Sequence, residues 1–189
     1  MMSIDLYLAS GSPRRQALLT DMGINFSRVV VDVEEQQKAG ESPYAYVSRL
    51  SQDKARAGVA KIGGHLPVLG ADTIVVDGEQ VLEKPRDEAD GARMLKQLSG
   101  REHQVMTAVT VANAMKQVTT VVTTRVWFRE LTDDDIRAYW QSKEPMDKAG
   151  GYAIQGLGGK FVTRIDGSYH AVVGLPLYET EQLLKQFMA

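Results

Sequence analysis

Three absences narrow what this chain can be. It contains no cysteine, which excludes disulfide bonds and thiolate metal ligands. No apolar run approaches the roughly 20 residues that a membrane-spanning helix needs, and no N-terminal stretch resembles a signal peptide. The three histidines are scattered, and none forms a zinc-type pair with another ligand. We therefore expect a cytoplasmic protein with no membrane partner.

The chain also lacks an excess of charge of either sign. Its 22 basic and 24 acidic residues leave a net charge of −2 at pH 7. A protein that holds nucleic acid nonspecifically needs a broad positive field, so no nucleic-acid partner is expected and any cationic site must be local. The length of 189 residues fits one large domain, or one domain with a small appended lobe.

Hydrophobic periodicity and turn residues predict alternating strands and helices in the first half of the chain. The expected order is a strand near residue 6, a helix over 13–22, a strand over 26–31, a helix over 42–62, a strand over 67–76, a hairpin to 80–82, and a helix after Asp87. The Val- and Thr-rich stretch 103–128 predicts two long paired strands, followed by a helix from Thr132, a strand over 161–165 and a C-terminal helix. The expected fold class is α/β, with a mixed, twisted β-sheet flanked by helices.

A short segment after the first strand has the features of a phosphate site. Ser12 can cap the following helix, and Pro13 suits its first turn. The free N–H groups and the dipole of a helix N-terminus attract anions, and Arg14 or Arg15 can add forked, charged donors. A Ser-Pro pair also begins many ordinary surface helices, so anion binding and a plain helix start stand as equal alternatives.

Acidic residues stand at two strand positions. Asp72 interrupts an otherwise apolar strand, where an unpaired carboxylate costs several kcal/mol and shifts its pKa instead. It serves either chemistry or a structural network of backbone N–H groups. Glu34 and Glu35 follow another strand. If one of them meets Asp72, two carboxylates and a phosphate favour a hard cation such as Mg²⁺.

Two lysines and one glutamine are further candidates. Lys54 lies one turn after Leu50 on the second helix, and Lys84 stands on a rigid segment before Pro85. Each can reach a polyphosphate or simply extend into solvent. The five glycines between residues 147 and 159 match neither a Walker motif nor a dinucleotide fingerprint. Gln155 among them both donates and accepts hydrogen bonds, as recognition of a base edge requires.

The order of these motifs resembles the Maf family of nucleotide pyrophosphatases. The matching segments are Ser10-Gly11-Ser12-Pro13-Arg14-Arg15, Lys54-Ala55, Gly70-Ala71-Asp72-Thr73, Glu83-Lys84-Pro85, Tyr152-Ala153-Ile154-Gln155-Gly156 and Gly174-Leu175-Pro176. The resemblance implies one Maf-like domain over residues 1–189, elongated and similar to inosine triphosphate pyrophosphatases, with two lobes around a central cleft. It also implies a homodimer that hydrolyses nucleoside triphosphates to monophosphate and pyrophosphate with a divalent cation, Mg²⁺ or Mn²⁺.

The same resemblance implies roles for individual residues. Asp72 corresponds to the proton acceptor and, together with Glu35, to the metal ligands, although Glu34 beside it leaves that choice open. Catalytic positions on the phosphate side correspond to Lys54 and Lys84, and substrate-binding positions to Ser10, Arg14, Arg15, Thr73 and Gln155. The combination of Arg14, Thr73 and Gln155 resembles the branch that acts on dTTP and UTP.

Two other functions compete with this one. A nucleotide-sensing or regulatory module linked to cell division would bind a pyrimidine triphosphate without hydrolysing it, through much the same anion site. Asp72 argues against this alternative, because a binder gains little from a carboxylate near phosphates. An enzyme acting on another phosphate ester would use Arg15 and the lysines but would have no evident need for Gln155.

Overall fold

A mixed seven-stranded sheet is the frame of the structure, a computed structural model that describes residues 3–188. The strands are β1 (Leu6–Leu8), β2 (Phe26–Arg28), β3 (Val68–Asp77), β4 (Gln80–Leu82), β5 (Glu102–Ala112), β6 (Gln117–Phe128) and β7 (Val162–Asp166). Their order is β2-β1-β3-β5-β6-β7, with β4 paired to β3. Strand β1 runs parallel to β2 and β3, whereas β3–β4 and β6–β7 are antiparallel. The predicted α/β class with a mixed sheet is confirmed.

Helices flank this sheet, and most begin and end where the sequence predicts. They are α1 (Pro13–Asp21), α2 (Pro43–Ile62), α3 (Glu88–Leu98), α4 (Asp133–Gln141), α5 (Tyr169–Val173) and α6 (Leu177–Leu184), with short 3-10 helices η1 (Glu144–Asp147), η2 (Ala149–Gly151) and η3 (Leu157–Phe161). The sequence did not predict α5 or the 3-10 turns. Among the described residues, no helix is long and apolar enough to cross a membrane.

The chain divides into two compact units. Unit 1 comprises the chain up to Asp72, Thr107–Val122 and the residues from Gly174 onward, and unit 2 comprises Thr73–Met106 and Thr123–Val173. The long strands β3, β5 and β6 contribute residues to both units.

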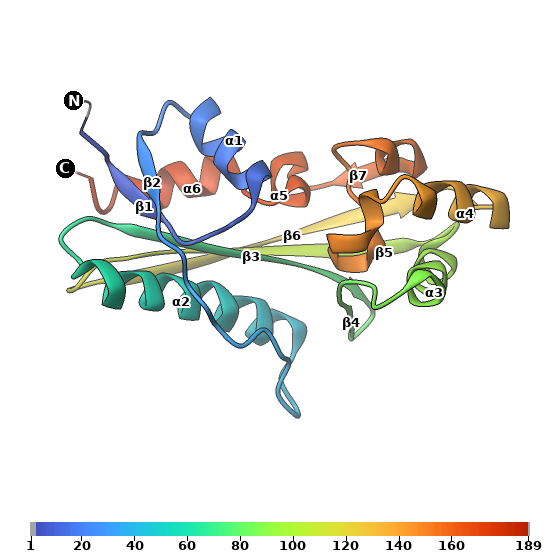
Figure 1. The fold of residues 1–189 in the computed structure, drawn as a ribbon, viewed down its shortest axis with the longest axis horizontal. Coiled ribbons are helices and arrows are strands. Elements are labelled where there is room, and N and C mark those ends of the chain that lie inside the picture. Colours follow the sequence, from blue (N-terminus) through green and yellow to red (C-terminus); the bar gives the residue numbers. More distant parts are fainter. Residues whose placement is uncertain (1–2, 189) are drawn as a thin grey trace. The chain divides into compact units, whose positions relative to one another are not determined.

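In unit 1, α2 covers one face of the sheet, and α1 and α6 lie on the other (Figure 1). Local signals set the ends of α2: the Ser42 side chain accepts a hydrogen bond from the N–H of Ala45, and Gly63 ends the helix with φ +83°. The helix packs tightly on β3, because a Cβ at Gly70 would lie 2.5 Å from the carbonyl oxygen of Ser51. This close approach places the polar residues of α2 next to those of β3.

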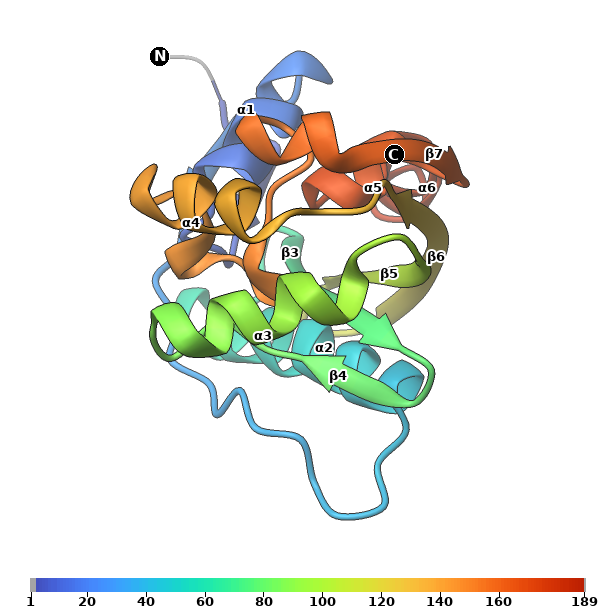
Figure 2. The same cartoon turned by 90° about the vertical axis from the view of Figure 1, so that its right-hand side faces the viewer.

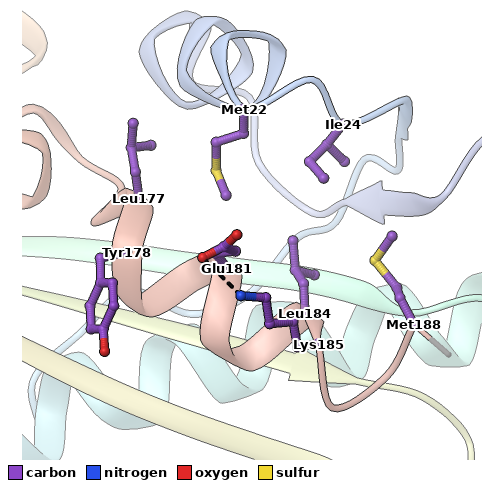
Figure 3. Close-up of a pocket in the computed structure, with 8 residues that line it drawn as sticks. All are labelled: Met22, Ile24, Leu177, Tyr178, Glu181, Leu184, Lys185 and Met188. Atoms are coloured by element: carbon purple, nitrogen blue, oxygen red, sulfur yellow. Dashed lines mark ion pairs between the residues drawn. The ribbon is translucent and has the colours of Figure 1, made fainter.

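An apolar groove of about 500 Å³ lies between the end of α1 and helix α6 in unit 1 (Figure 3). Its lining residues are Met22, Ile24, Leu177, Tyr178, Glu181, Leu184, Lys185 and Met188. The only charged lining residues, Glu181 and Lys185, pair with each other at 3.2 Å. A second, polar cavity of unit 1 is lined by Ser10, Glu35 and Lys54 among others, and the groove shares no lining residue with it.

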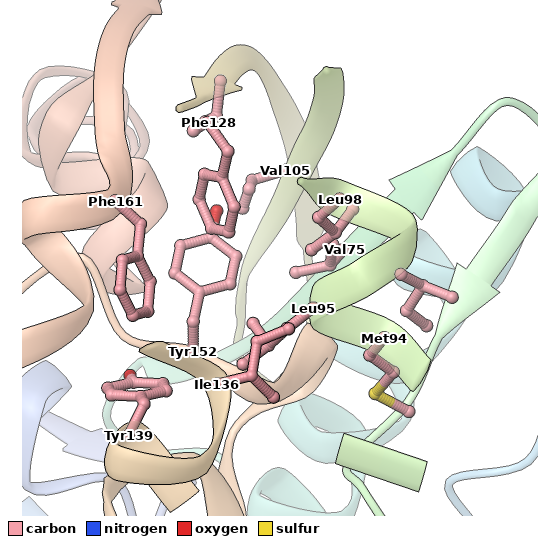
Figure 4. Close-up of a cluster of buried hydrophobic side chains, with 12 residues drawn as sticks. Val75, Met94, Leu95, Leu98, Val105, Phe128, Ile136, Tyr139, Tyr152 and Phe161 are labelled. Carbon is pink, nitrogen blue, oxygen red and sulfur yellow. The ribbon is translucent and has the colours of Figure 1, made fainter. Parts of the chain in front are cut away.

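Unit 2 is built around an aromatic and aliphatic core (Figure 4). Phe128 and Tyr152 meet edge to face with ring centroids 4.7 Å apart, and Tyr139 meets Phe161 in the same way at 5.0 Å. Helix α3 lies beside β4 (Figure 2), where Gln97 donates a hydrogen bond to Gln80 at 2.9 Å. Thr132 and Asp135 form a capping box at the start of α4, the helix that the sequence predicts from Thr132. The core therefore holds α4 and the glycine-rich segment together.

Candidate active site

The start of α1 holds an arginine in a fixed position. The N–H of Arg15 donates to the capping oxygen of Ser12 at 3.3 Å, and the N–H of Ser12 donates to Ser10 Oγ at 3.1 Å. The Arg15 side chain turns inward: its Nε donates to the carbonyl oxygen of Gly174 at 2.8 Å, and its Nη1 lies 3.4 Å from Ser10 Oγ. Only 9% of Arg15 is exposed. A buried, hydrogen-bonded guanidinium at a helix N-terminus is therefore built into unit 1.

The electrostatic surroundings of Arg15 include the two predicted acids. Burial lowers the pKa of Arg15, whereas the negative charges of Asp72 and Glu35 raise it. Arg14, the next residue on α1, acts in the same direction as burial. Since a guanidinium stays charged in proteins, Arg15 supplies a permanent positive charge within electrostatic reach of both carboxylates.

Lys54 brings the two predicted acids together. Its Nζ lies 2.9 Å from Asp72 Oδ1 and 2.8 Å from Glu35 Oε1. These residues come from three places in unit 1: Lys54 from α2, Asp72 from β3, and Glu35 from the segment after β2. The close packing of α2 on Gly70 makes the Lys54–Asp72 contact possible, because a larger residue at position 70 would strike the backbone N of Ala55, 2.6 Å away.

Asp72 is nearly buried among charged side chains. It is 9% exposed, and burial raises its pKa, while the positive charges of Lys54 and Arg15 oppose that rise and Glu35 adds to it. A carboxylate with an increased affinity for protons takes up a proton more readily than an exposed one. The signal that the sequence offered, a carboxylate in an apolar strand, therefore coincides with a charged cluster.

A polar cavity of about 440 Å³ opens beside this cluster in unit 1. Its lining residues are Ala9, Ser10, Gly11, Arg28, the segment Val29–Val33, Glu35 and Lys54. Sequence analysis did not select Arg28. In the parallel β1–β2 pair, Arg28 lies in register with Leu8. Leu8 precedes Ser10 by two residues. Ligands generally bind at the carboxyl ends of parallel strands, and this preference is the signal that could have identified Arg28.

The other predicted residues are half-buried or exposed. Arg14 is half-buried on α1. Glu34 and Glu35 are both exposed, and the ion pair with Lys54 is made by Glu35. Thr73, Lys84 and Gln155 belong to unit 2. Thr73 follows Asp72 in β3 and is half-buried, Lys84 is exposed in the segment before α3, and Gln155 is exposed in a turn before η3.

The carboxylates of the cluster set a limit on metal binding. Among residues 3–188, no three His, Cys, Asp or Glu side chains are grouped so that they could hold a metal ion. Glu35 and Asp72 nevertheless direct oxygens at one point, now occupied by the ammonium of Lys54. Two carboxylates are what Mg²⁺ commonly takes from a protein when substrate phosphates and water complete its coordination.

Comparisons with known proteins show what this chain is similar to. A sequence model of the family described as Maf-like protein matches residues 5–187. A dTTP/UTP pyrophosphatase of Vibrio cholerae is 63% identical over 182 residues, covering 96% of this chain and 97% of the relative. A protein of the same name from Photobacterium profundum is 59% identical over 194 residues, covering 100% and 99%. Among solved structures, a HAM1 protein from Coxiella burnetii aligns with a TM-score of 0.47 and 19% identity, covering 67% of this chain and 73% of that one.

Proposed function

This chain belongs to the Maf family, and from that premise we propose that it is a nucleoside triphosphate pyrophosphatase acting on dTTP and UTP. The products are the nucleoside monophosphate and pyrophosphate. Relatives at about 60% identity over nearly their whole length carry the name dTTP/UTP pyrophosphatase, so the substrate class rests on them. The chemistry rests on the residues of unit 1.

The observation that carries the proposal is the nearly buried Asp72 in contact with Lys54 and within electrostatic reach of Arg15. A protein that only binds a triphosphate needs the cations but gains nothing from a carboxylate that repels the same phosphates. A hydrolase uses the carboxylate to handle the attacking water. The cluster therefore favours hydrolysis over a nucleotide-sensing role.

The reaction assigns a task to each residue of the cluster. Water attacks the α-phosphorus, a new oxygen–phosphorus bond forms, and the bond to the bridging oxygen of the β-phosphate breaks, releasing pyrophosphate. Asp72 accepts the proton that the water loses. Arg15, Lys54 and the positive end of the α1 dipole stabilise the negative charge that develops on the phosphates. Ser10 holds the Arg15 guanidinium and lines the cavity.

A divalent cation, Mg²⁺ or Mn²⁺, fits the donors present. Glu35 and Asp72 would hold it, because their oxygens converge on one cationic position and hard oxygen ligands suit both metals. When bound, such a cation neutralises phosphate charge and polarises the phosphorus–oxygen bonds. With two protein carboxylates to hold it, its affinity depends on the triphosphate, so metal and substrate are expected to bind together.

The remaining roles follow the family pattern. Lys84 contacts the phosphates, whereas Arg14 and Thr73 contribute to substrate selection, and Gln155 reads the base through its amide. Thymine and uracil present the same hydrogen-bonding edge and differ by one methyl group, worth about 1 to 3 kcal/mol in a binding pocket. Use of both dTTP and UTP is therefore expected. The same pattern extends the proposal to a cytoplasmic homodimer. Sedimentation equilibrium of the purified protein tests whether it is a dimer.

The decisive experiment is a panel of nucleoside triphosphates with Mg²⁺ in water labelled with oxygen-18. The proposal expects pyrophosphate release from dTTP and UTP, with the label in the monophosphate, because water attacks the α-phosphorus. Label in the pyrophosphate would show attack at the β-phosphorus. Orthophosphate as the first product would show attack at the γ-phosphorus, and either result would refute the proposed reaction.

A further inference from the structure

The turn that carries Gln155 is held by two side chains from outside it, Tyr139 of α4 and Glu144 of η1. Before Gln155, the N–H of Ala153 donates to Tyr139 Oη at 3.1 Å. After it, the N–H groups of Leu157 and Gly158 donate to Glu144 Oε1 and Oε2, each at 3.0 Å. The Tyr139 hydroxyl in turn donates to Glu144. The backbone on both sides of Gln155 is therefore bonded to one Tyr–Glu pair, all within unit 2.

The glycines of this segment make room for that pair. A Cβ at Gly156 would lie 2.1 Å from Glu144 Oε1, and one at Gly158 would lie 2.6 Å from Tyr139 Oη. Gly156 also has φ +151°, a backbone conformation that side chains rarely adopt. The close approach that glycine permits at these two positions is therefore an approach to Glu144 and Tyr139.

The hydroxyl of Tyr139 and the carboxylate of Glu144 keep their protonation states near neutral pH. Tyr139 is 3% exposed, and both burial and its hydrogen bond to Glu144 raise its pKa. Burial acts to raise the pKa of Glu144, but the bonds from Tyr139, Gly158 and Leu157 hold it below its usual value. A neutral hydroxyl and an ionised carboxylate thus face each other, and charge-assisted bonds of this kind are stronger than neutral ones.

We propose that Glu144 and Tyr139 are positioning residues for base recognition, because they fix the turn that presents Gln155. The inference rests on the proposed function, in which the Gln155 amide reads the pyrimidine. A side chain on a mobile turn loses conformational entropy when it binds, and a pre-ordered turn avoids that cost. Gln155 itself is exposed, so its orientation depends on the backbone that carries it.

The test is Glu144→Gln, assayed with UTP and CTP. These substrates share sugar and phosphates and differ only at the base edge, so their ratio of kcat/KM isolates base reading. A glutamine offers one acceptor oxygen where the carboxylate offers two, which leaves an N–H of Leu157 or Gly158 without an acceptor. We expect the UTP:CTP ratio to fall on the order of 10-fold. The KM for UTP should rise while kcat stays within about twofold, the signature of lost ground-state binding.

Two further variants sharpen the test. Glu79→Gln is the matched control, since Glu79 is an exposed carboxylate at the β3–β4 turn of the same unit, and it should leave the ratio unchanged. Tyr139→Phe removes only the hydroxyl and should shift the ratio in the same direction, which keeps the inference testable if Glu144→Gln does not fold. Amide hydrogen exchange over residues 153–158 should accelerate in Glu144→Gln and not in Glu79→Gln.

The outcomes separate this inference from the proposed function. A folded Glu144→Gln protein that hydrolyses UTP with the UTP:CTP ratio of the unmodified chain would overturn the positioning role and leave the pyrophosphatase function standing. A lower melting temperature with that same ratio would mean that the pair serves stability alone, and it also overturns the inference. Failure of the unmodified chain to release pyrophosphate from UTP would instead refute the proposed function on which the inference rests.

Discussion

The ammonium nitrogen of Lys54 lies 2.9 Å from Oδ1 of Asp72 and joins the middle of α2 to β3. The side chains of both residues are 12% exposed, so little solvent weakens the attraction between them. Burial raises the pKa of Asp72 and the lysine opposes that rise. The net result is an increased affinity of the carboxylate for protons, which suits its proposed role as a general base.

Asp72→Asn should reduce kcat for UTP by about 10² to 10⁴, the usual contribution of a general base. The amide has nearly the same shape, so the fold is expected to persist. The control is Asp53→Asn, because Asp53 is the neighbour of Lys54 on α2 but pairs with Arg49 at 3.4 Å. Steady-state kinetics with circular dichroism checks both variants. Near-full turnover by Asp72→Asn would remove this residue from the mechanism.

Glu35 and Glu34 are adjacent acids, so variants of each can test which one helps to bind the metal. Both are exposed, and Glu35 is the one that pairs with Lys54. Glu35→Gln should increase the Mg²⁺ concentration for half-maximal activity by at least about 10-fold, since losing even an outer partner of a metal site has such effects. Glu34→Gln should leave it unchanged. Titration of activity with Mg²⁺ measures this, and equal behaviour of the two variants would contradict the assignment of Glu35.

Gly70 controls how closely α2 approaches β3. A Cβ at this position would lie 2.5 Å from Ser51 O and 2.6 Å from Ala55 N, both backbone atoms of α2. Gly70→Ala should therefore lower the free energy of unfolding by about 1 to 3 kcal/mol, the typical cost of overpacking. Urea unfolding measures the change. Gly11→Ala is the control for stability, because its nearest contact would be an ordinary 3.7 Å to Arg28, and a similar loss in both variants would refute the steric explanation.

His103 gives unit 2 a pH-dependent stability. It is 3% exposed, and its Nε2 lies 2.6 Å from the Tyr152 hydroxyl. Burial lowers its pKa from 6.5 to about 4, with Asp77 opposing the shift. Between these values the unfolded chain binds a proton that the folded chain does not. The free energy of unfolding therefore falls as pH drops through this window, by up to about 3 kcal/mol.

The measurement is the difference in unfolding free energy between the protein and its His103→Gln variant, taken from pH 7.5 to pH 4. This difference should become less favourable to the unmodified chain as the pH falls, because only that chain carries the buried imidazole. The carboxylates titrate equally in both proteins, so their contributions to the unfolding free energy cancel in the difference. A difference that stays constant with pH would show that His103 does not take up a proton on unfolding in this range.

The sequence alone determined most of the secondary structure and singled out Asp72, Glu35 and Lys54, which the structure brings into contact. Ser42-Pro43 and Gly63 mark the two ends of α2 correctly, and Asp77-Gly78 marks the β3–β4 hairpin. These signals act within a few residues, since a cap or a tight turn is formed by neighbours along the chain. Asp72 was recognisable for a related reason: a carboxylate inside an apolar strand needs a partner whatever the fold.

Which side chains meet depends on the packing of the whole fold. Lys54 pairs with Glu35 and not Glu34 because the path of the segment after β2 determines which of two adjacent acids reaches α2. Arg28 lines the cavity, and Glu144 holds the turn of Gln155, although neither stands in a motif that the sequence analysis selected. Such contacts join positions far apart in the chain. They depend on how helices and strands pack, which local propensities do not specify.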